Sequence, residues 1–288
     1  MMVLVTSANG KVGRRIIPEL VKKGLEVKAM DINPGVEALK ELGAKETFVG
    51  DARKADVVRE AMQGCDKVLY IPPMFVYDEA KMAKLAIDIA IEQKISKFVL
   101  MSVLHPQMST LIQHTQKLEV EEYIIYKGLS ADLDYTILQP IHYHHTFDVS
   151  GVWNNNRAFI FYDVNARLSG VDASDVGEIA AKVLTESGHE HATYELSGPD
   201  FISAAESIEI FNKVTGKNAK IVQIDIEDLI KMNGITDSYG CEAFRALAYT
   251  YGNFGFRGNA NVLTWLLGRA PKTFEDFLKN EIKALHLS

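Results

Sequence analysis

The sequence predicts an α/β fold, a doubly wound parallel sheet of Rossmann type with a smaller C-terminal substrate lobe. Two observations lead to this prediction. Short apolar runs alternate with segments of helical periodicity from the N-terminus to about residue 101, which is the pattern of consecutive βαβ units. The first of these units has a tight turn of small residues between its strand and its helix, as doubly wound folds commonly do.

Composition excludes several classes of protein. The 288 residues are 47% hydrophobic and 24% charged, which is typical of a globular chain with a sizeable core. The net charge is −7 and basic residues form no run, so we expect no nucleic-acid partner. No apolar stretch approaches the roughly 20 residues of a membrane span. We therefore expect a cytoplasmic protein without membrane contact.

The first βαβ unit is predicted from residues 2–31. An apolar strand at 2–5 is followed by a small-residue turn at 6–10, a helix at 12–23 and a strand at 26–31. Gly24 follows the helix in the position of a C-terminal capping glycine. The alternation then continues with a helix at 36–42, a strand at 46–49, a helix at 55–62, a strand at 67–71, a helix at 78–93 and a strand at 97–101.

After residue 102 the alternation becomes less regular. The expected elements are a helix at 111–127, a strand at 134–139, a helix at 173–187, a strand at 193–196, a helix at 203–215, a strand at 219–225 and further helices from 227. We predict a dinucleotide-binding Rossmann domain at 1–150, to which later strands return. Residues 151–288 are predicted to form a smaller, mostly helical substrate-binding lobe, with the substrate bound between the two.

The turn at residues 6–13 reads TSANGKVG. Gly10 and Gly13 occupy the last two positions of a GxxGxxG pattern, and Ser7 stands where the first glycine belongs. A helix N-terminus offers unpaired N–H groups and partial positive charge to a pyrophosphate. An ordinary βα turn is the alternative. The predicted cofactor contacts are Thr6, Ser7, Asn9, Gly10, Lys11 and Val12.

An acidic residue ends the second predicted strand. Asp31 lies 18 residues after Gly13, where a carboxylate accepts hydrogen bonds from both hydroxyls of an adenosine ribose. Because it would repel a 2′-phosphate, we predict NAD as the cofactor. NADP is the alternative, with a cation supplied by the glycine turn. Asp31 can also be read as a solvated strand end. Asp51 is a further candidate cofactor contact near the adenine, or the cap of the next helix.

The order of several segments resembles the NmrA-like branch of the atypical short-chain dehydrogenase/reductase superfamily. The resemblance covers most of the chain and is carried by VTSANGKVG, KLEVEEYI, DYTILQP, VDASDVGEIAAKVL, YELSGPDFIS and WLLGRAPKTFEDF. It implies a Rossmann sheet that binds a nicotinamide dinucleotide. Some members of this branch are reductases of small compounds, and others bind the dinucleotide and report redox state to a partner.

The resemblance also points to Lys117, in KLEVEEYI, as the lysine that holds the nicotinamide ribose. A lysine on a solvated helix face is the alternative. The usual short-chain enzyme has a tyrosine four residues before this lysine, but Gln113 stands there, so the usual proton donor is missing. His114 is a weaker candidate donor, displaced by one residue from its place in related sequences. Gln139 replaces the family's usual arginine.

The remaining candidates follow predicted strands. Ser102, after the strand at 97–101, is expected to contact nicotinamide or substrate, or alternatively to cap a turn. Tyr143 is a candidate catalytic residue or a rim aromatic. No metal site is predicted, because neighbouring histidines on a strand point to opposite faces. Cofactor contacts are expected from Ile71, Pro72, Pro73 and Pro140, and substrate contacts from Phe75, His142, Tyr143 and His144.

These observations predict an NAD(P)-dependent oxidoreductase that moves hydride between the nicotinamide and a small hydrophobic carbonyl, quinone or enone. The alternative is a non-catalytic dinucleotide-binding sensor that acts through a protein partner, which the missing tyrosine favours. The histidine-rich segment after residue 141, which a sensor does not need, favours the enzyme. We expect a monomer or a homodimer.

Overall fold

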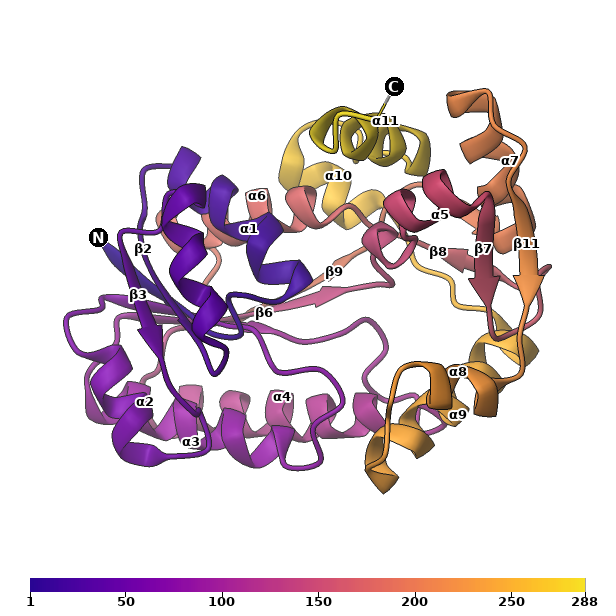
Figure 1. Ribbon diagram of the computed structural model, residues 1–288. Coiled ribbons are helices and arrows are strands. Elements are labelled where there is room, and N and C mark those ends of the chain that lie inside the picture. Colours follow the sequence, from indigo (N-terminus) through magenta and orange to yellow (C-terminus); the bar gives the residue numbers. More distant parts are fainter. Residues whose placement is uncertain (288) are drawn as a thin grey trace. The chain divides into compact units, whose positions relative to one another are not determined.

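The structure is a computed structural model that describes residues 1–287 (Figure 1). It divides into two compact units. The first comprises residues 1–107, 114–140 and 173–194, and the second comprises 108–113, 141–172 and the chain from 195 onward. The expected boundary after residue 150 is therefore replaced by one after residue 140. The segment at 173–194 returns to the first unit because its helix packs against the first helix of the chain.

The first unit contains a seven-stranded sheet in the order β3-β2-β1-β4-β5-β6-β9. The pairings from β3 through to β6 are parallel, which confirms the doubly wound Rossmann-type prediction. The strands are β1 (Met2–Val5), β2 (Glu26–Asp31), β3 (Glu46–Val49), β4 (Lys67–Tyr70), β5 (Lys97–Met101), β6 (Tyr135–Pro140) and β9 (Ala192–Leu196).

Helices cover both faces of this sheet (Figure 1). One face carries α1 (Lys11–Lys22) and α6 (Ala173–Thr185), and the other carries α2 (Ala55–Met62), α3 (Glu79–Glu92) and α4 (Ile112–Ala131). The segment expected as a helix at 36–42 is a 3-10 helix, η1 (Pro34–Leu42), with Pro34 at its start and Asn33 as its cap. Proline fits the first helical turn because its missing N–H would be unpaired there.

Burial on both faces explains the continuous apolar strands. Every residue of β1, β5 and β6 is buried, as expected for parallel strands between two helical layers. The core beneath α2, α3 and α4 includes Leu4, Val68, Phe98 and Ile137. Burying one such side chain stabilises the folded state by about 1.5–3 kcal/mol relative to leaving it exposed. The packing of these strands therefore stabilises the sheet whose strand ends form the candidate site.

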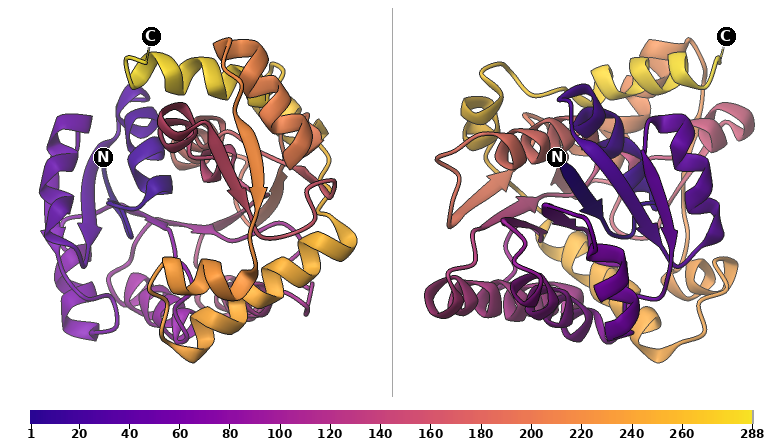
Figure 2. Two further views of the ribbon diagram at one scale, coloured as in Figure 1. Left: turned by 45° about the vertical axis from the view of Figure 1, so that its right-hand side comes forward. Right: turned by 90° about the vertical axis from the view of Figure 1, so that its left-hand side faces the viewer.

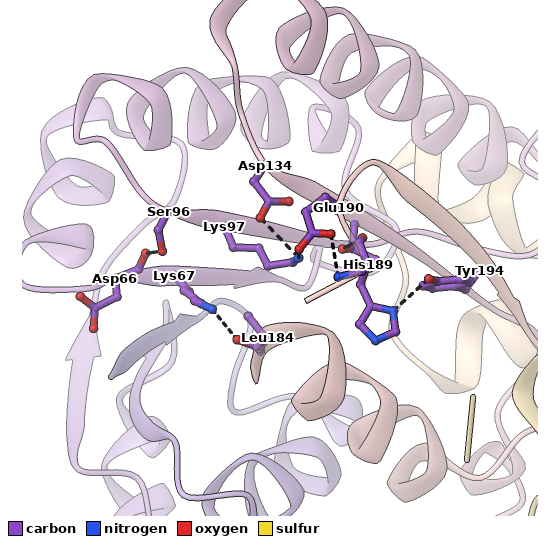
Figure 3. Close-up of polar contacts among 11 residues, drawn as sticks. Asp66, Lys67, Ser96, Lys97, Asp134, Leu184, His189, Glu190 and Tyr194 are labelled. Carbon is purple, nitrogen blue, oxygen red and sulfur yellow. Dashed lines mark hydrogen bonds and ion pairs between the residues drawn. The ribbon is translucent and has the colours of Figure 1, made fainter. Parts of the chain in front are cut away.

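Charged side chains gather at the amino edge of the sheet (Figure 3). Lys97 begins β5 and is almost fully buried, with its Nζ 3.4 Å from Oδ2 of Asp134 and 4.0 Å from Oε1 of Glu190. Lys67 begins β4 and donates to the carbonyl oxygen of Leu184 at 2.5 Å. Burial, followed by the charge of Lys97, lowers the pKa of Lys67. Each of these two lysines therefore has a partner at the edge opposite to the glycine turn.

We expect changes in this cluster to alter stability and leave ligand binding intact. Asp134→Ala removes the nearer partner of buried Lys97, so the free energy of unfolding should fall by about 1–3 kcal/mol. Lys97→Met with Asp134→Ala should recover most of this loss, because an apolar replacement removes the unpaired charge. Urea unfolding measures both effects. A double variant no more stable than Asp134→Ala would contradict the assignment.

The second unit has two small sheets and its own apolar core. Strands β7 (Arg157–Ile160) and β11 (Lys220–Gln223) pair in parallel and lie side by side in Figure 2, and β8 (Arg167–Ser169) pairs antiparallel with β10 (Phe201–Ser203). This unit was expected to be mostly helical, and three of its strands were not predicted because each has only three or four residues. Its core includes Val152, Phe211, Phe274 and Leu278.

The helices of the second unit are mostly short and capped. They are η2 (His144–Thr146), α5 (Val149–Asn155), α7 (Ala204–Thr215), α8 (Ile226–Met232), α9 (Ser238–Phe254), α10 (Asn261–Leu267) and α11 (Phe274–Ala284). Capping boxes start two of them, Ser203 with Glu206 and Thr273 with Asp276, and each box pairs two otherwise free N–H groups. Within residues 1–287, none of the helices is long and apolar enough to cross a membrane.

Candidate functional site

The turn between β1 and α1 has the geometry of a phosphate-binding loop. Gly10 precedes the helix, and within the described chain no side chain caps the first turn of α1. The backbone N–H groups of the first helical turn, from Lys11 and Val12 onward, are therefore available to an anion. A Cβ atom on Gly13 would lie 2.4 Å from the carbonyl oxygen of Ala8, so only glycine permits this close packing.

Ser7 and Thr6 fix the start of the turn. Ser7 has φ 45°, a left-handed conformation that favours glycine, and its carbonyl oxygen accepts from the N–H of Gly10 at 3.1 Å. Ser7 therefore adopts the backbone conformation that the first glycine of the pattern would have. Thr6 Oγ1 donates to the carbonyl oxygen of Ile71 at 2.9 Å and accepts from the Ile71 N–H at 2.8 Å. The hydroxyl joins the ends of β1 and β4.

Asp31 holds two loops beside the turn. Its Oδ2 accepts from the N–H of Asn9 at 3.0 Å and its Oδ1 accepts from the N–H of Asn33 at 2.9 Å. A carboxylate has about four acceptor positions, so each oxygen can still accept from a ribose hydroxyl. Arg14 donates to Oδ1 of Asn9 through Nη2 at 2.7 Å. A cation therefore stands at the turn, as the NADP alternative requires.

Asp51 is committed mainly to its own loop. Its Oδ1 accepts from the backbone N–H of Arg53 at 3.0 Å and from Nε of Arg53 at 2.9 Å. These bonds lower the pKa of Asp51. The residue at the N-cap position of α2 is Lys54, so Asp51 organises the turn before the helix. Its contact with an adenine stays a prediction.

A buried carboxyl group stands behind Ser102 at the carboxyl end of β5. The Ser102 hydroxyl donates to Oε1 of Glu121 on α4, and Nε2 of Gln139 donates to the two oxygens of Glu121 at 2.9 and 3.0 Å. All three residues are buried. Burial raises the pKa of Glu121, and the hydrogen bonds from Ser102 and Gln139 oppose that rise. Gln139, in place of an arginine, gives Glu121 hydrogen bonds without a positive charge.

Lys117 lies one helical turn before Glu121 and forms a buried ion pair. Its Nζ is 2.7 Å from Oε1 of Glu79, whose side chain is only 2% exposed. Burial raises the pKa of Glu79, and Lys117 opposes the rise. An ammonium group has three donors, so this pairing leaves two for the ribose hydroxyls that Lys117 is predicted to bind.

Tyr70 and Glu79 line a small cavity in the first unit. Its volume is about 10 Å³, and Pro72, Ser102 and Lys117 also line it, so it has the size of roughly one water molecule. Tyr70 Oη and Glu79 Oε2 are buried atoms without a hydrogen-bond partner among residues 1–287. The cavity brings the predicted residues Ser102 and Lys117 together.

His114 is held as a neutral imidazole. Its Nδ1 lies 3.1 Å from the carbonyl oxygen of His105, and a carbonyl only accepts, so Nδ1 carries the proton. Burial lowers the pKa of His114 to about 4. A neutral imidazole that gives its N–H to a backbone carbonyl is a poor acid. The geometry therefore favours Ser102 over His114 as the proton donor.

The other predicted contacts of the first unit lie at the ends of β4 and β6. Ile71 is bound to Thr6, and Pro72 lines the small cavity. Pro140 is buried, and its carbonyl oxygen accepts from the N–H of Leu104 at 3.0 Å. Pro73 and Phe75 lie in the loop before α3, where Phe75 has φ 55°.

The histidine-rich segment belongs to the second unit. His142, Tyr143 and His144 all line a cavity of about 130 Å³ within that unit. Tyr143 stacks on His145 with ring centroids 4.9 Å apart, and His144 packs edge-on against Phe274 at 5.5 Å. Burial raises the pKa of Tyr143 above its usual range. The structure thus groups these three predicted substrate contacts around one space.

Sequence reasoning did not single out Glu121 or Glu79, whereas Tyr70 was expected to border the nicotinamide pocket. The sequence did contain a signal for Glu121, because this residue stands four positions after Lys117 within the KLEVEEYI segment. Its charge, however, suggested a solvated helix face. Glu79 could not be found, because its ion pair joins residues 38 positions apart. Within residues 1–287, no group of three His, Cys, Asp or Glu side chains is arranged to hold a metal ion.

Comparison with known proteins finds the same architecture in reductases. The NmrA-like family matches residues 1–278. The NAD(P)H azoreductase of Xenophilus azovorans is 24% identical over 285 residues, which is 96% of this chain and 97% of the relative. Quinone oxidoreductase 2 of Escherichia coli is 25% identical over 244 residues, 82% of this chain and 83% of the relative.

A solved structure extends the likeness to the fold. The crystal structure of an NADPH-dependent quinone oxidoreductase of Escherichia coli in complex with NADPH superposes with a TM-score of 0.77 and 21% sequence identity. The superposition covers 98% of this chain and 100% of the other. The fold is therefore shared along almost the whole length of both chains.

Proposed function

Because the chain belongs to the NmrA-like family of atypical short-chain dehydrogenases and reductases, we propose that it is an NAD(P)H-dependent reductase of small uncharged carbonyl, quinone or enone compounds. The site fits a dinucleotide on its own evidence. The first turn of α1 has no side-chain cap in the described chain, and the Asp31 oxygens keep acceptor positions for a ribose. When bound, the nicotinamide supplies a hydride.

The buried Ser102–Glu121 pair is the observation that carries the proposal. Ser102 lies just beyond the carboxyl end of β5, the edge where α/β sheets bind ligands. A carbonyl that accepts hydride develops negative charge on its oxygen, and that oxygen needs a proton. When Glu121 is protonated, its carboxyl donates to Oγ of Ser102. Ser102 then gives its own hydroxyl proton to the substrate oxygen and takes the proton of Glu121 in its place. The pair replaces the tyrosine missing at Gln113.

Three further side chains are assigned to binding. Lys117 holds the nicotinamide ribose with the donors that Glu79 leaves free. Tyr143 and His142 line an uncharged cavity in the second unit, which favours an uncharged substrate over a phosphorylated or carboxylated one. Arg14 is not required by this assignment, because its guanidinium is bound to Asn9.

We expect NADH to bind more tightly than NADPH, because Asp31 would lie beside a 2′-phosphate. Asp31→Asn keeps an acceptor for a backbone N–H and removes the charge. The ratio of the NADPH and NADH dissociation constants should therefore fall about tenfold, which corresponds to about 1.4 kcal/mol. Fluorescence titration with each cofactor measures the ratio, and Asp132→Asn, at an exposed position, is the matched control. Equal ratios in all three proteins would contradict the role of Asp31.

The reaction is tested by a single turnover. Protein saturated with NADH is mixed with p-benzoquinone, an aromatic aldehyde or cyclohexenone, and nicotinamide absorbance is followed in stopped flow. Oxidation by at least one compound that slows in Ser102→Ala, with unchanged NADH affinity, supports the reductase. Equal rates in Ser102→Ala and the unaltered protein would reject Ser102 as the donor.

A non-catalytic dinucleotide sensor is the second candidate, and Gln113 at the tyrosine position favours it. In a sensor, cofactor binding shifts a conformational equilibrium that a protein partner reads. Tight NADH binding without turnover of any compound in the panel would support the sensor. Failure to bind either cofactor would reject both candidates.

A further inference from the structure

The cavity of the second unit has mostly apolar walls. It has a volume of about 130 Å³ and lies among η2, β7, β8, β10, α7 and α11. An apolar protein cavity of about 150 Å³ accommodates benzene, so this one has room for a single aromatic ring. Its apolar walls include Phe147, Ala158, Ile160, Leu168, Ile202 and Phe274.

The walls carry no formal charge. Within residues 1–287, the cavity is lined by no Asp, Glu, Lys or Arg side chain. A charged ligand group would lose its hydration without gaining an opposite charge, which costs several kcal/mol. The occupant is therefore uncharged, and its binding depends on shape and on hydrogen bonds.

One hydrogen-bond acceptor on the wall can be identified from the contacts of Thr146. The hydroxyl of Thr146 donates to the carbonyl oxygen of Tyr143 at 2.8 Å, since a carbonyl cannot donate. Thr146 Oγ1 also lies 2.8 Å from Nε2 of His142. The single hydroxyl proton is already used, so Nε2 of His142 carries a proton and donates it to Thr146.

The other ring nitrogen of His142 is consequently a bare acceptor. Burial, with a smaller contribution from His144, lowers the pKa of His142 to about 4, so the ring stays neutral at neutral pH. The side-chain hydrogen bond of His142 within residues 1–287 is made through Nε2. The ring is oriented edge-on by Tyr251, with centroids 5.8 Å apart. A fixed ring presents its lone pair at small entropic cost.

We propose that this cavity binds one uncharged monocyclic phenol or hydroquinone, whose hydroxyl donates to Nδ1 of His142. The aromatic walls favour a planar ring, because Phe147 and Phe274 already pack edge-to-face with centroids 5.3 Å apart. This inference rests on the proposed function, because the same cavity is assigned there to the substrate, and it adds the chemical class of the occupant and the acceptor that binds it. Binding itself requires no cofactor.

The test compares phenol with toluene, which has the same shape and no donor. Calorimetric or NMR titration of the full chain without cofactor should give a dissociation constant about fivefold lower for phenol than for toluene, the effect of one hydrogen bond. His142→Phe should make the two ligands equal. Ala158→Leu fills the cavity and should remove the binding of both. His286→Phe, at an exposed position, is the matched control.

A second measurement reads the tautomer directly. In ¹⁵N-histidine-labelled protein, the Nδ1 signal of His142, assigned by its loss in His142→Phe, should be that of an unprotonated nitrogen at pH 6 and should move with phenol only. Equal affinities for phenol and toluene, unchanged binding in Ala158→Leu, or a protonated Nδ1 would each overturn the proposal. Thermal unfolding verifies that each variant is folded. If the unaltered protein binds phenol but oxidises NADH with none of the test compounds, the reductase function alone is rejected and the phenol site is not.

Discussion

Glu121→Gln is expected to lower kcat of the reductase about 100-fold at neutral pH, the lower end of what a positioned acid contributes. Glutamine keeps an acceptor for the Ser102 hydroxyl and has no acidic proton to return to it. The amide of Gln139 can turn to present its oxygen, so packing is retained. Steady-state kinetics with saturating NADH measures the effect, and Glu119→Gln, in an exposed ion pair with Lys84, is the matched control.

The pH profile separates proton supply from a structural role. Burial raises the pKa of Glu121. Because the proposed role of Glu121 is to supply a proton, kcat should fall as pH rises through that pKa. The Glu121→Gln variant should lack this limb. Gln139→Arg supplies the missing cation, which favours the ionised carboxylate and should move the limb to lower pH. A profile that is the same in all three proteins would exclude Glu121 as the source of the proton.

Lys117→Met is expected to lower the free energy of unfolding by about 3 kcal/mol at pH 8. Glu79 is only 2% exposed, and breaking a buried ion pair leaves an uncompensated charge. Burial already raises the pKa of Glu79, and without Lys117 it should rise further. The folded variant then binds a proton more tightly than the unfolded chain, so its stability is retained below about pH 4.5 and lost as pH rises.

Urea unfolding at pH 5 and pH 8 measures this dependence. The double variant Glu79→Gln with Lys117→Met should regain most of the stability and lose the pH dependence, because no buried charge remains. A loss in Lys117→Met that is equal at both pH values would show that the deficit comes from packing alone. NADH affinity in Glu79→Gln, which keeps the lysine, separates ribose binding from stability.

The sheet and most of its helices could be predicted from the sequence, because each depends on local periodicity. Buried runs such as 97–101 read as strands, and the helix that follows the glycine turn has a clear apolar face. The glycine turn was predictable because a Cβ atom at Gly13 would lie too close to the carbonyl oxygen of Ala8, and the cofactor contact of Asp31 stays a prediction. The short strands β8 and β10 were not predicted. Each has only three residues, which is too few to show an alternation of apolar and polar side chains.

The inner part of the site could not be predicted because it is built from distant pairs. Lys117 was predicted to hold the nicotinamide ribose, with a solvated helix face as the alternative, but nothing in the sequence connects it with Glu79. Only the tertiary structure brings these residues of α4 and α3 together. Gln139 was visible as a departure from the family, but its consequence depends on Glu121 lying within hydrogen-bond distance. Local patterns predict which elements form, and tertiary packing decides which charges are removed from water.

The path of the chain has a practical consequence for exchanging modules among relatives. The chain changes unit after residues 107, 113, 140, 172 and 194, so five junctions would have to be matched to transplant one unit into another protein. No single cut separates the two. Substrate preference in this architecture is therefore expected to change by point substitution within the second unit, and much less readily by recombination of whole segments.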